Sequence, residues 1–107
     1  MDAWESTDLV AAHSAAGARY HEFLRVPDLS GGIYVLDAGA IDMQSPHTED
    51  ELYYVLAGHG TLTVNGSGRE IGPDDAVLVP TGVHHGLHAD RGETLRILLI
   101  FGKPQPR

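Results

Sequence analysis

From Gly32 onward, short runs of strand-forming residues alternate with turns that carry glycine or proline. Runs such as ELYYVLAG, TLTV and DAVLVP are rich in β-branched, aromatic and aliphatic residues, and Asn65-Gly66 is typical of a tight reversal between strands. The 13 glycines and 6 prolines of this chain fit frequent turns. The pattern predicts an all-β domain, built as an antiparallel sandwich or a small barrel.

The N-terminal quarter of the chain differs from this pattern, and we expect it to pack outside the barrel. Ser6-Thr7-Asp8 can cap a helix, the alanine-rich run that follows favours a short one, and Gly17 is placed to end it. Tyr20–Val26 reads as an edge strand. With 107 residues we expect one domain. Its predicted parts are a helix and edge strand over 1–31, a barrel over 32–102 and a frayed tail over 103–107.

The composition excludes several classes of function. A net charge of −8 argues against nucleic acid and anionic membrane surfaces as partners. The chain has no cysteine, which excludes disulfides, thiol catalysis and cysteine-ligated zinc. The acidic start MDAWESTDLV lacks the features of a signal peptide, and no apolar stretch approaches the length of a membrane span. We therefore expect a soluble cytoplasmic protein.

Several predicted strands, such as YYVL, AVLV and LRILLIF, are apolar on both faces. A sheet in so small a domain turns one face to the core and the other to water. The second apolar face therefore needs a cover, either the N-terminal helix or a second copy of the chain. We expect a homodimer in which Leu52, Tyr54 and Leu56, which share one strand parity, lie against the partner.

Two stretches contain the residues that are suited to chemistry. GAIDMQSPHTEDELYYVLAGHG places His47 before Glu51, and DDAVLVPTGVHHGLHA places His85 after a proline- and glycine-bearing turn. Four residues of straight strand span about 13 Å, too far for His47 and Glu51 to share one ion. The intervening Thr48-Glu49-Asp50 is turn-prone, however, and a reversal there puts the two on neighbouring strands. His85 then brings a third group from across the sheet.

Two imidazoles and one carboxylate form a facial ligand set suited to Fe(II), Mn(II) or Ni(II), and zinc would also be tolerated. We therefore predict that His47, Glu51 and His85 bind one divalent metal ion. Structural alternatives are a turn role for His47, a solvated strand start for Glu51 and a hydrogen-bonded core histidine for His85. Tyr53 shares a face with Glu51 in a regular strand, so its hydroxyl is a candidate catalytic group; the alternative is a buried core tyrosine.

The remaining polar residues near these stretches are expected to have other roles. His84 and His88 fall on the face opposite His85 by strand parity. His59 lies between two glycines and is expected to be solvated. Glu49 and Asp50 are expected to shape the turn before the strand.

The two stretches resemble the two motifs of the cupin superfamily, in the right order. Glu51 and Gly58 have the separation of the first motif, and Pro80, Gly82 and His85 match the Pro-x-Gly-x-x-His of the second. Three positions depart from the family pattern: Ser45 stands in place of the first histidine, Asp74 in place of a glycine and Ala89 in place of a frequent asparagine.

A second alignment puts His47 at the first-histidine position and Glu49 at the second, but it leaves too few residues before Glu51. Under the preferred alignment, Ser45 is either a holder of a metal-bound water or an ordinary turn serine.

The resemblance implies a jelly-roll-like double-stranded β-helix of the small single-domain, conserved-barrel type. It also implies a metal-dependent enzyme of the dioxygenase, isomerase, epimerase or lyase type that acts on a small polar metabolite. Two alternatives stand beside it: a non-catalytic barrel that binds a small ligand or metal, and a barrel whose missing histidine marks a lost site. The fold alone favours no single reaction.

Overall fold

The computed structural model describes residues 1–44 and 48–102. Within these residues it forms one helix and nine strands, which confirms the predicted all-β fold with a short N-terminal helix. The predicted edge strand is present with its predicted bounds. The elements are α1 (Ser6–Ala16), β1 (Tyr20–Val26), β2 (Leu29–Leu36), β3 (Ile41–Gln44), β4 (Glu51–Ala57), β5 (Gly60–Val64), β6 (Ser67–Ile71), β7 (Ala76–Val79), β8 (His85–Ala89) and β9 (Leu95–Gly102).

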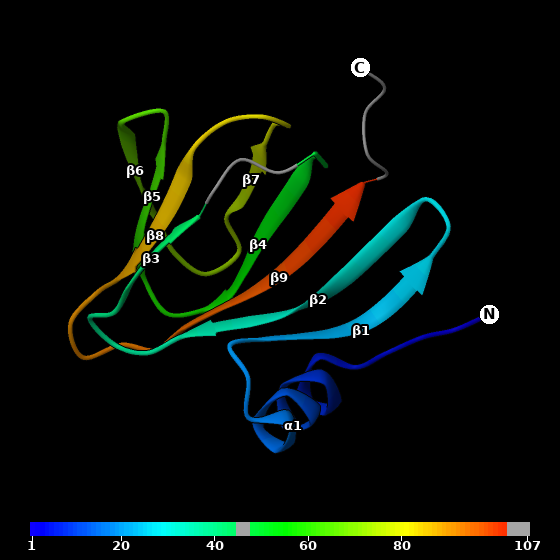
Figure 1. Ribbon diagram of the computed structural model, residues 1–107. Helices are drawn as coiled ribbons and strands as arrows, with labels where there is room; N and C mark the ends of the chain where they lie inside the picture. Colours follow the sequence, from blue (N-terminus) through cyan, green and yellow to red (C-terminus); the bar gives the residue numbers. More distant parts are fainter. Residues whose placement is uncertain (45–47, 103–107) are drawn as a thin grey trace.

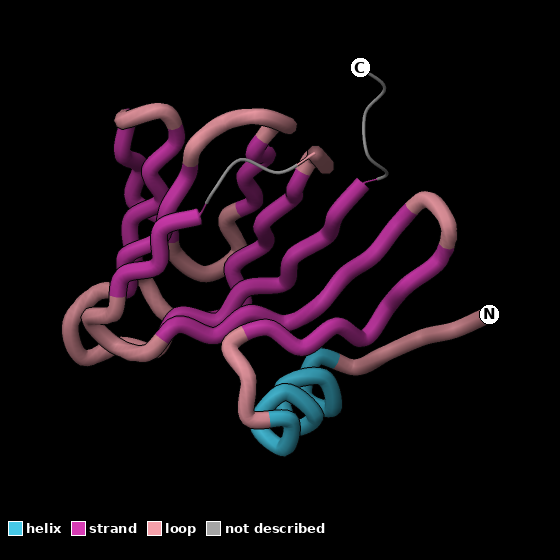
Figure 2. Tube along the Cα trace, viewed as in Figure 1, coloured by secondary structure: helices cyan, strands magenta, loops and turns pink. Residues whose placement is uncertain are grey.

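The strands form two antiparallel sheets that face each other (Figure 1). The larger sheet has the order β1-β2-β9-β4-β7, and the smaller has the order β3-β8-β5-β6. Figure 2 shows the two sheets meeting at one end and opening toward the other, with α1 outside the larger sheet. The space between the sheets is therefore the interior in which a site can lie.

Strand alternation fills this interior with apolar side chains. Along β4, Tyr53 and Val55 are fully buried and Tyr54 between them is not. β9 repeats the pattern with Leu95, Ile97 and Leu99. The smaller sheet adds a facing layer from β5, β6 and β8, namely Leu62, Ile71, Leu87 and Ala89. Each large apolar side chain buried in this way stabilises the fold by about 1.5–3 kcal/mol.

α1 is attached to the larger sheet by few contacts. Its single buried residue is His13, whose Nε2 lies 2.7 Å from the carbonyl oxygen of Arg19. Gly17 ends the helix in the left-handed conformation at φ 75°, as predicted. The predicted cap differs, because Glu5 occupies the N-cap position and Ser6-Thr7-Asp8 forms the first turn. Glu5 accepts backbone bonds from Asp8 and Leu9 at 3.1 and 3.2 Å, so the first turn closes within 1–44 without a side-chain cap.

The outer face of the larger sheet is only partly covered. α1 lies beside Leu56, and the two line a common cavity. Farther along the same face Leu52 is 42% exposed, and Leu78, opposite it on β7, is 62% exposed. The predicted outward parity of Leu52 is thus confirmed. The helix covers one end of the face, and the other end is open.

No helix within 1–44 or 48–102 is long and apolar enough to cross a membrane.

Candidate functional site

Two predicted site residues, Glu51 and His85, meet inside the barrel. Glu51 begins β4 in the larger sheet and His85 begins β8 in the smaller one, and both side chains point inward. Their exposed fractions are 1% and 2%. The Nε2 of His85 lies 3.2 Å from Oε2 of Glu51. The two cupin-like stretches therefore converge on one buried pair of polar groups.

Hydrogen bonds between Thr81 and Asp50, which we call the turn anchor, bring the two residues to the same end of the barrel. The backbone N–H and the hydroxyl of Thr81 both donate to Oδ1 of Asp50, at 2.8 and 2.9 Å. These two bonds hold the pKa of the Asp50 carboxyl below its usual range. Asp50 precedes Glu51, and the Thr81 turn precedes His85, so this contact sets the spacing of the pair. Gly82, at φ 82°, supplies the left-handed backbone of the turn.

Two polar contacts orient the His85 ring and favour its charged form. Its Nδ1 lies 3.2 Å from the carbonyl oxygen of Val83, which can only accept, so Nδ1 carries a hydrogen. With the Glu51 carboxylate ionised, the contact at Nε2 takes a second hydrogen, which gives the imidazolium form. Consistently, the bond to Glu51 raises the pKa of His85, while burial opposes the increase. Without a metal, the two groups form a buried ion pair.

Tyr53 lies next to this pair on the inner face of β4, as its parity predicts. Its ring is fully buried and meets the His85 ring edge to face, with 6.2 Å between the centroids. Burial is the main cause of the raised pKa of Tyr53, and the Glu51 carboxylate raises it further. The phenol is therefore neutral at physiological pH and able to donate a hydrogen bond. Its catalytic role stays a prediction.

A second polar pair, which sequence reasoning missed, lies between the same sheets. The Tyr34 hydroxyl on β2 donates to the Asp42 carboxylate on β3, and Arg19 approaches Asp42 with Nη1 at 3.6 Å from Oδ1. Burial and this bond raise the pKa of Tyr34. Asp42 pairs with Leu87 in the sheet, so it shares the inward parity of His85 on the neighbouring strand. That register was the available signal, but it requires knowing that β3 pairs with β8.

Tyr20 is a further residue that the sequence did not identify. Its ring covers Gly32, where a Cβ would come within 2.4 Å of Cζ, and it meets Phe101 edge to face at 6.0 Å. Burial, together with the neighbouring charge of Glu22, raises its pKa to about 12. The hydroxyl is buried and has no hydrogen-bond partner among the described residues. Tyr20 and Glu49 both line a cavity of about 190 Å³, at the end of the barrel where Glu51 lies.

The other histidines follow the sequence prediction in part. His84 and His88 are exposed, which confirms that they lie on the face opposite His85. His59 is exposed but not merely solvated, because its Nδ1 lies 3.0 Å from Oε2 of Glu93. Its ring also packs over Gly72, where a Cβ would come within 2.7 Å of it.

The predicted third ligand, His47, and the neighbouring Ser45 lie outside the described residues. Within 1–44 and 48–102, no three histidine or carboxylate side chains are grouped closely enough to hold a metal ion. Glu51 and His85 nevertheless fit two ligand positions. Donor atoms at right angles on one ion, each about 2.1 Å from it, lie about 3.0 Å apart. The 3.2 Å between Nε2 and Oε2 is close to this separation.

Comparisons with known proteins agree with the fold. The family model described as "Cupin domain" matches residues 32–101. The uncharacterized protein SCO3923 of Streptomyces coelicolor is 38% identical over 105 residues, which cover 98% of this chain and 99% of that protein.

Solved structures with the same fold include TT1209 from Thermus thermophilus, with a TM-score of 0.77 at 18% identity over 99% of this chain and 100% of that one. A cupin protein from Bacteroides fragilis, BF4112, has a TM-score of 0.71 at 24% identity over 78% of this chain and 75% of that one. At such identities these likenesses show the fold alone.

Proposed function

The chain belongs to the cupin domain family, and on this premise we propose that it is a metal-binding cupin, in which Glu51 and His85, together with His47, hold one divalent ion. Fe, Mn, Ni and Zn all suit two imidazoles and a carboxylate. The proposed activity is that of a metal-dependent enzyme acting on a small polar metabolite.

The buried Glu51–His85 pair is the observation that carries the proposal. Removing a carboxylate and an imidazole from water costs several kcal/mol per ion, and their attraction often fails to offset it. Apolar side chains of similar size would serve stability at least as well. The orientation of His85 also supports the proposal, because the Val83 carbonyl holds Nδ1 and leaves Nε2 directed at the carboxylate.

In the proposed site, each residue has a separate task. A bound metal would supply a Lewis acid or an activator of oxygen. Glu51 and His85 would fix the ion, and the release of the Nε2 proton of His85 would accompany binding. The neutral hydroxyl of Tyr53 would donate a hydrogen bond to a substrate oxygen. The surrounding apolar side chains, including Val55 and Val79, would keep water out.

The second candidate is a non-catalytic module that holds a small ligand in the barrel. It needs only the polar groups that the described residues bring between the sheets, namely the Glu51–His85 pair and the neighbouring Tyr53 hydroxyl. Turnover of a substrate by the metal-loaded protein would separate the two candidates.

Metal stoichiometry tests the proposal. Protein supplied with Fe(II), Mn(II), Ni(II) or Zn(II) and then dialysed should retain about one ion per chain by elemental analysis. Glu51→Gln and His85→Ala should each lose it while keeping the parent's circular dichroism spectrum. His88→Ala, on the exposed face, is the matched control and should bind like the parent. A parent that retains none of the four metals, or ligand variants that bind as the parent does, would refute the metal site.

We also propose that the chain is a homodimer. The supporting observation is the open end of the outer face, where Leu52 and Leu78 lie opposite each other on neighbouring strands and are both exposed. Apolar side chains grouped in this way mark contact surfaces. Sedimentation at micromolar concentration should give twice the chain mass of 11.5 kDa. A species of the single-chain mass would contradict the proposal.

A further inference from the structure

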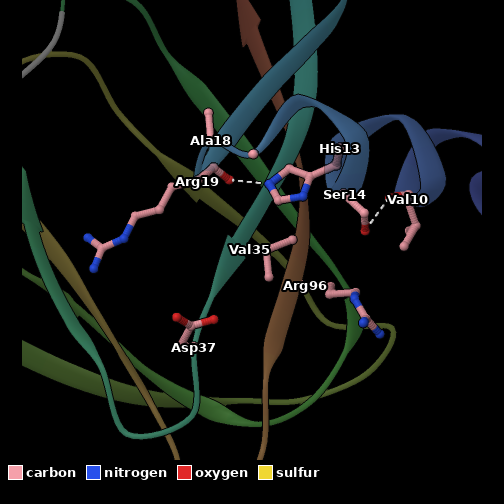
Figure 3. Close-up of a pocket in the computed structure, with 9 residues that line it drawn as sticks. Val10, His13, Ser14, Ala18, Arg19, Val35, Asp37 and Arg96 are labelled. Carbon is pink, nitrogen blue, oxygen red and sulfur yellow. Dashed lines mark hydrogen bonds between the residues drawn. The ribbon is translucent and has the colours of Figure 1, made fainter.

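A cavity of about 400 Å³ lies outside the barrel, between α1 and the outer face of the larger sheet. Val10 and His13 line it from the helix, and Val35 and Arg96 line it from β2 and β9 (Figure 3). Its volume falls in the range of small-molecule sites. The cavity is separate from the Glu51–His85 pair, because it lies on the opposite face of the sheet.

Arg96 is an unusual residue for its position. It lies on a central strand, opposite Val35 on one side and Ala57 on the other, and the next outward residues of β9 are Leu98 and Ile100. The side chain is partly buried, and it forms no ion pair within 1–44 and 48–102. Guanidinium remains charged in proteins, so partial burial without a counter-ion is unfavourable. In a chain of charge −8, a carboxylate partner would have been easy to supply.

The other polar groups around the cavity are already engaged or lie at its edge. Arg19 pairs with Asp42 at 3.6 Å. His13 donates from Nε2 to the Arg19 carbonyl at 2.7 Å. Asp37 is exposed and forms no ion pair with Arg96; Figure 3 shows the two side chains on opposite sides of Val35. Arg96 is thus the cation in this cavity that is available to a ligand.

We propose that this cavity binds a small organic monoanion, with its carboxylate on Arg96 and its short apolar body against Val10 and Val35. Guanidinium matches a carboxylate with two parallel hydrogen bonds, and a bound anion would neutralise the partly buried charge. Asp37 at the far edge repels a second negative charge, so a monoanion is preferred to a dianion. Such a ligand touches both the helix and the sheet, and therefore ties α1 to the barrel. The site goes beyond the proposed metal function and does not depend on it.

Butyrate is the probe, titrated at constant ionic strength and followed by amide chemical shifts. The parent should show saturable shifts in α1 and around Arg96, together with slower hydrogen exchange of the α1 amides. Arg96→Gln should weaken binding by about tenfold or more, because a charge-assisted contact is lost. Arg69→Gln is the matched control, an exposed arginine on β6 of the other sheet, and should bind like the parent.

A second variant keeps the test valid if Arg96→Gln fails to fold. Val10→Glu retains Arg96 but places a carboxylate in the cavity from a helix position, so it should also abolish butyrate binding. Succinate should bind more weakly than butyrate, and butylamine should produce no saturable shift. The proposal is overturned if the parent shows no saturable response, if butylamine or succinate binds as well as butyrate, or if Val10→Glu binds like the parent.

Discussion

The first two residues of β4, one on each face of the strand, invert the usual distribution of polarity. On the inner face Glu51 is 1% exposed among apolar side chains, whereas on the outer face Leu52 is 42% exposed. A strand selected only for stability would bury the leucine and expose the carboxylate. This inversion is why we propose that the inner face carries the metal site and that the outer face meets a second copy of the chain.

The largest expected effect comes from breaking the inner pair. His85→Leu in metal-free protein leaves the Glu51 carboxylate buried without its imidazolium, which should lower the free energy of unfolding by about 3 kcal/mol. The double variant Glu51→Leu/His85→Leu should recover most of that loss, because no buried charge remains. Urea unfolding measures the free energy of unfolding of the single and the double variant. Equal losses in the single and double variants would contradict the account, and His88→Leu controls for losing an exposed histidine.

The next effect concerns the outer face. Leu52→Glu places a charge where we propose that two copies meet, so dimer dissociation should become easier by about a hundredfold, or roughly 2.7 kcal/mol. Ile41→Glu is the matched control, because Ile41 is exposed on the smaller sheet. Sedimentation equilibrium over a concentration series would measure both. If the two variants associate equally well, the outer face of β4 is not the interface.

A smaller effect is expected from weakening the turn anchor between Thr81 and Asp50. Thr81→Val keeps the shape of the side chain and the backbone bond to Asp50 but removes the hydroxyl bond of 2.9 Å. The pair should then be less well positioned, and metal affinity should fall by about tenfold. Isothermal titration calorimetry with Mn(II) measures the metal affinity. Thr63→Val on β5 controls for the loss of a hydroxyl elsewhere. Unchanged affinity in Thr81→Val would show that the anchor serves only the fold.

The smallest effect is on the pH dependence of stability. Because the bond to Glu51 raises the folded-state pKa of His85, the pair contributes stability that is fully present below the ordinary histidine pKa. This contribution is lost as the pH rises through the raised folded-state value. Metal-free parent should therefore lose stability over that window relative to His85→Gln, as measured by urea unfolding at several pH values. If the stabilities of the parent and of His85→Gln changed in parallel with pH, the proposed ion pair between Glu51 and His85 would be contradicted.

The sequence predicted the features that depend on local pattern. Alternation and turn residues predicted the strands, and the resemblance to the two cupin motifs singled out Glu51 and His85, which the structure brings together as a buried pair. Tyr53 followed from the parity of one strand. These predictions needed no knowledge of which strands are neighbours.

The features that the sequence missed all depend on tertiary register. Asp42 is recognisable as an inward residue only once β3 is known to pair with β8. Tyr20 reaches over Gly32 because β1 and β2 pair there, beside a bulge between Glu22 and Leu24. The cavity at Arg96 exists only because α1 packs against β1 and β2 and faces Arg96 of β9, and the weakly patterned helix gave no sign of which face it would cover.

Anomalous diffraction from crystals grown with Mn(II) would locate the proposed metal ion. We expect one strong peak per chain between the two sheets, bonded to the Glu51 carboxylate and to Nε2 of His85, with Nδ1 of His85 still hydrogen-bonded to Val83. We expect no peak at that place in Glu51→Gln crystals grown in the same way. A peak elsewhere on the molecule, or an intact Glu51–His85 ion pair in Mn(II)-saturated crystals, would contradict the proposed metal site.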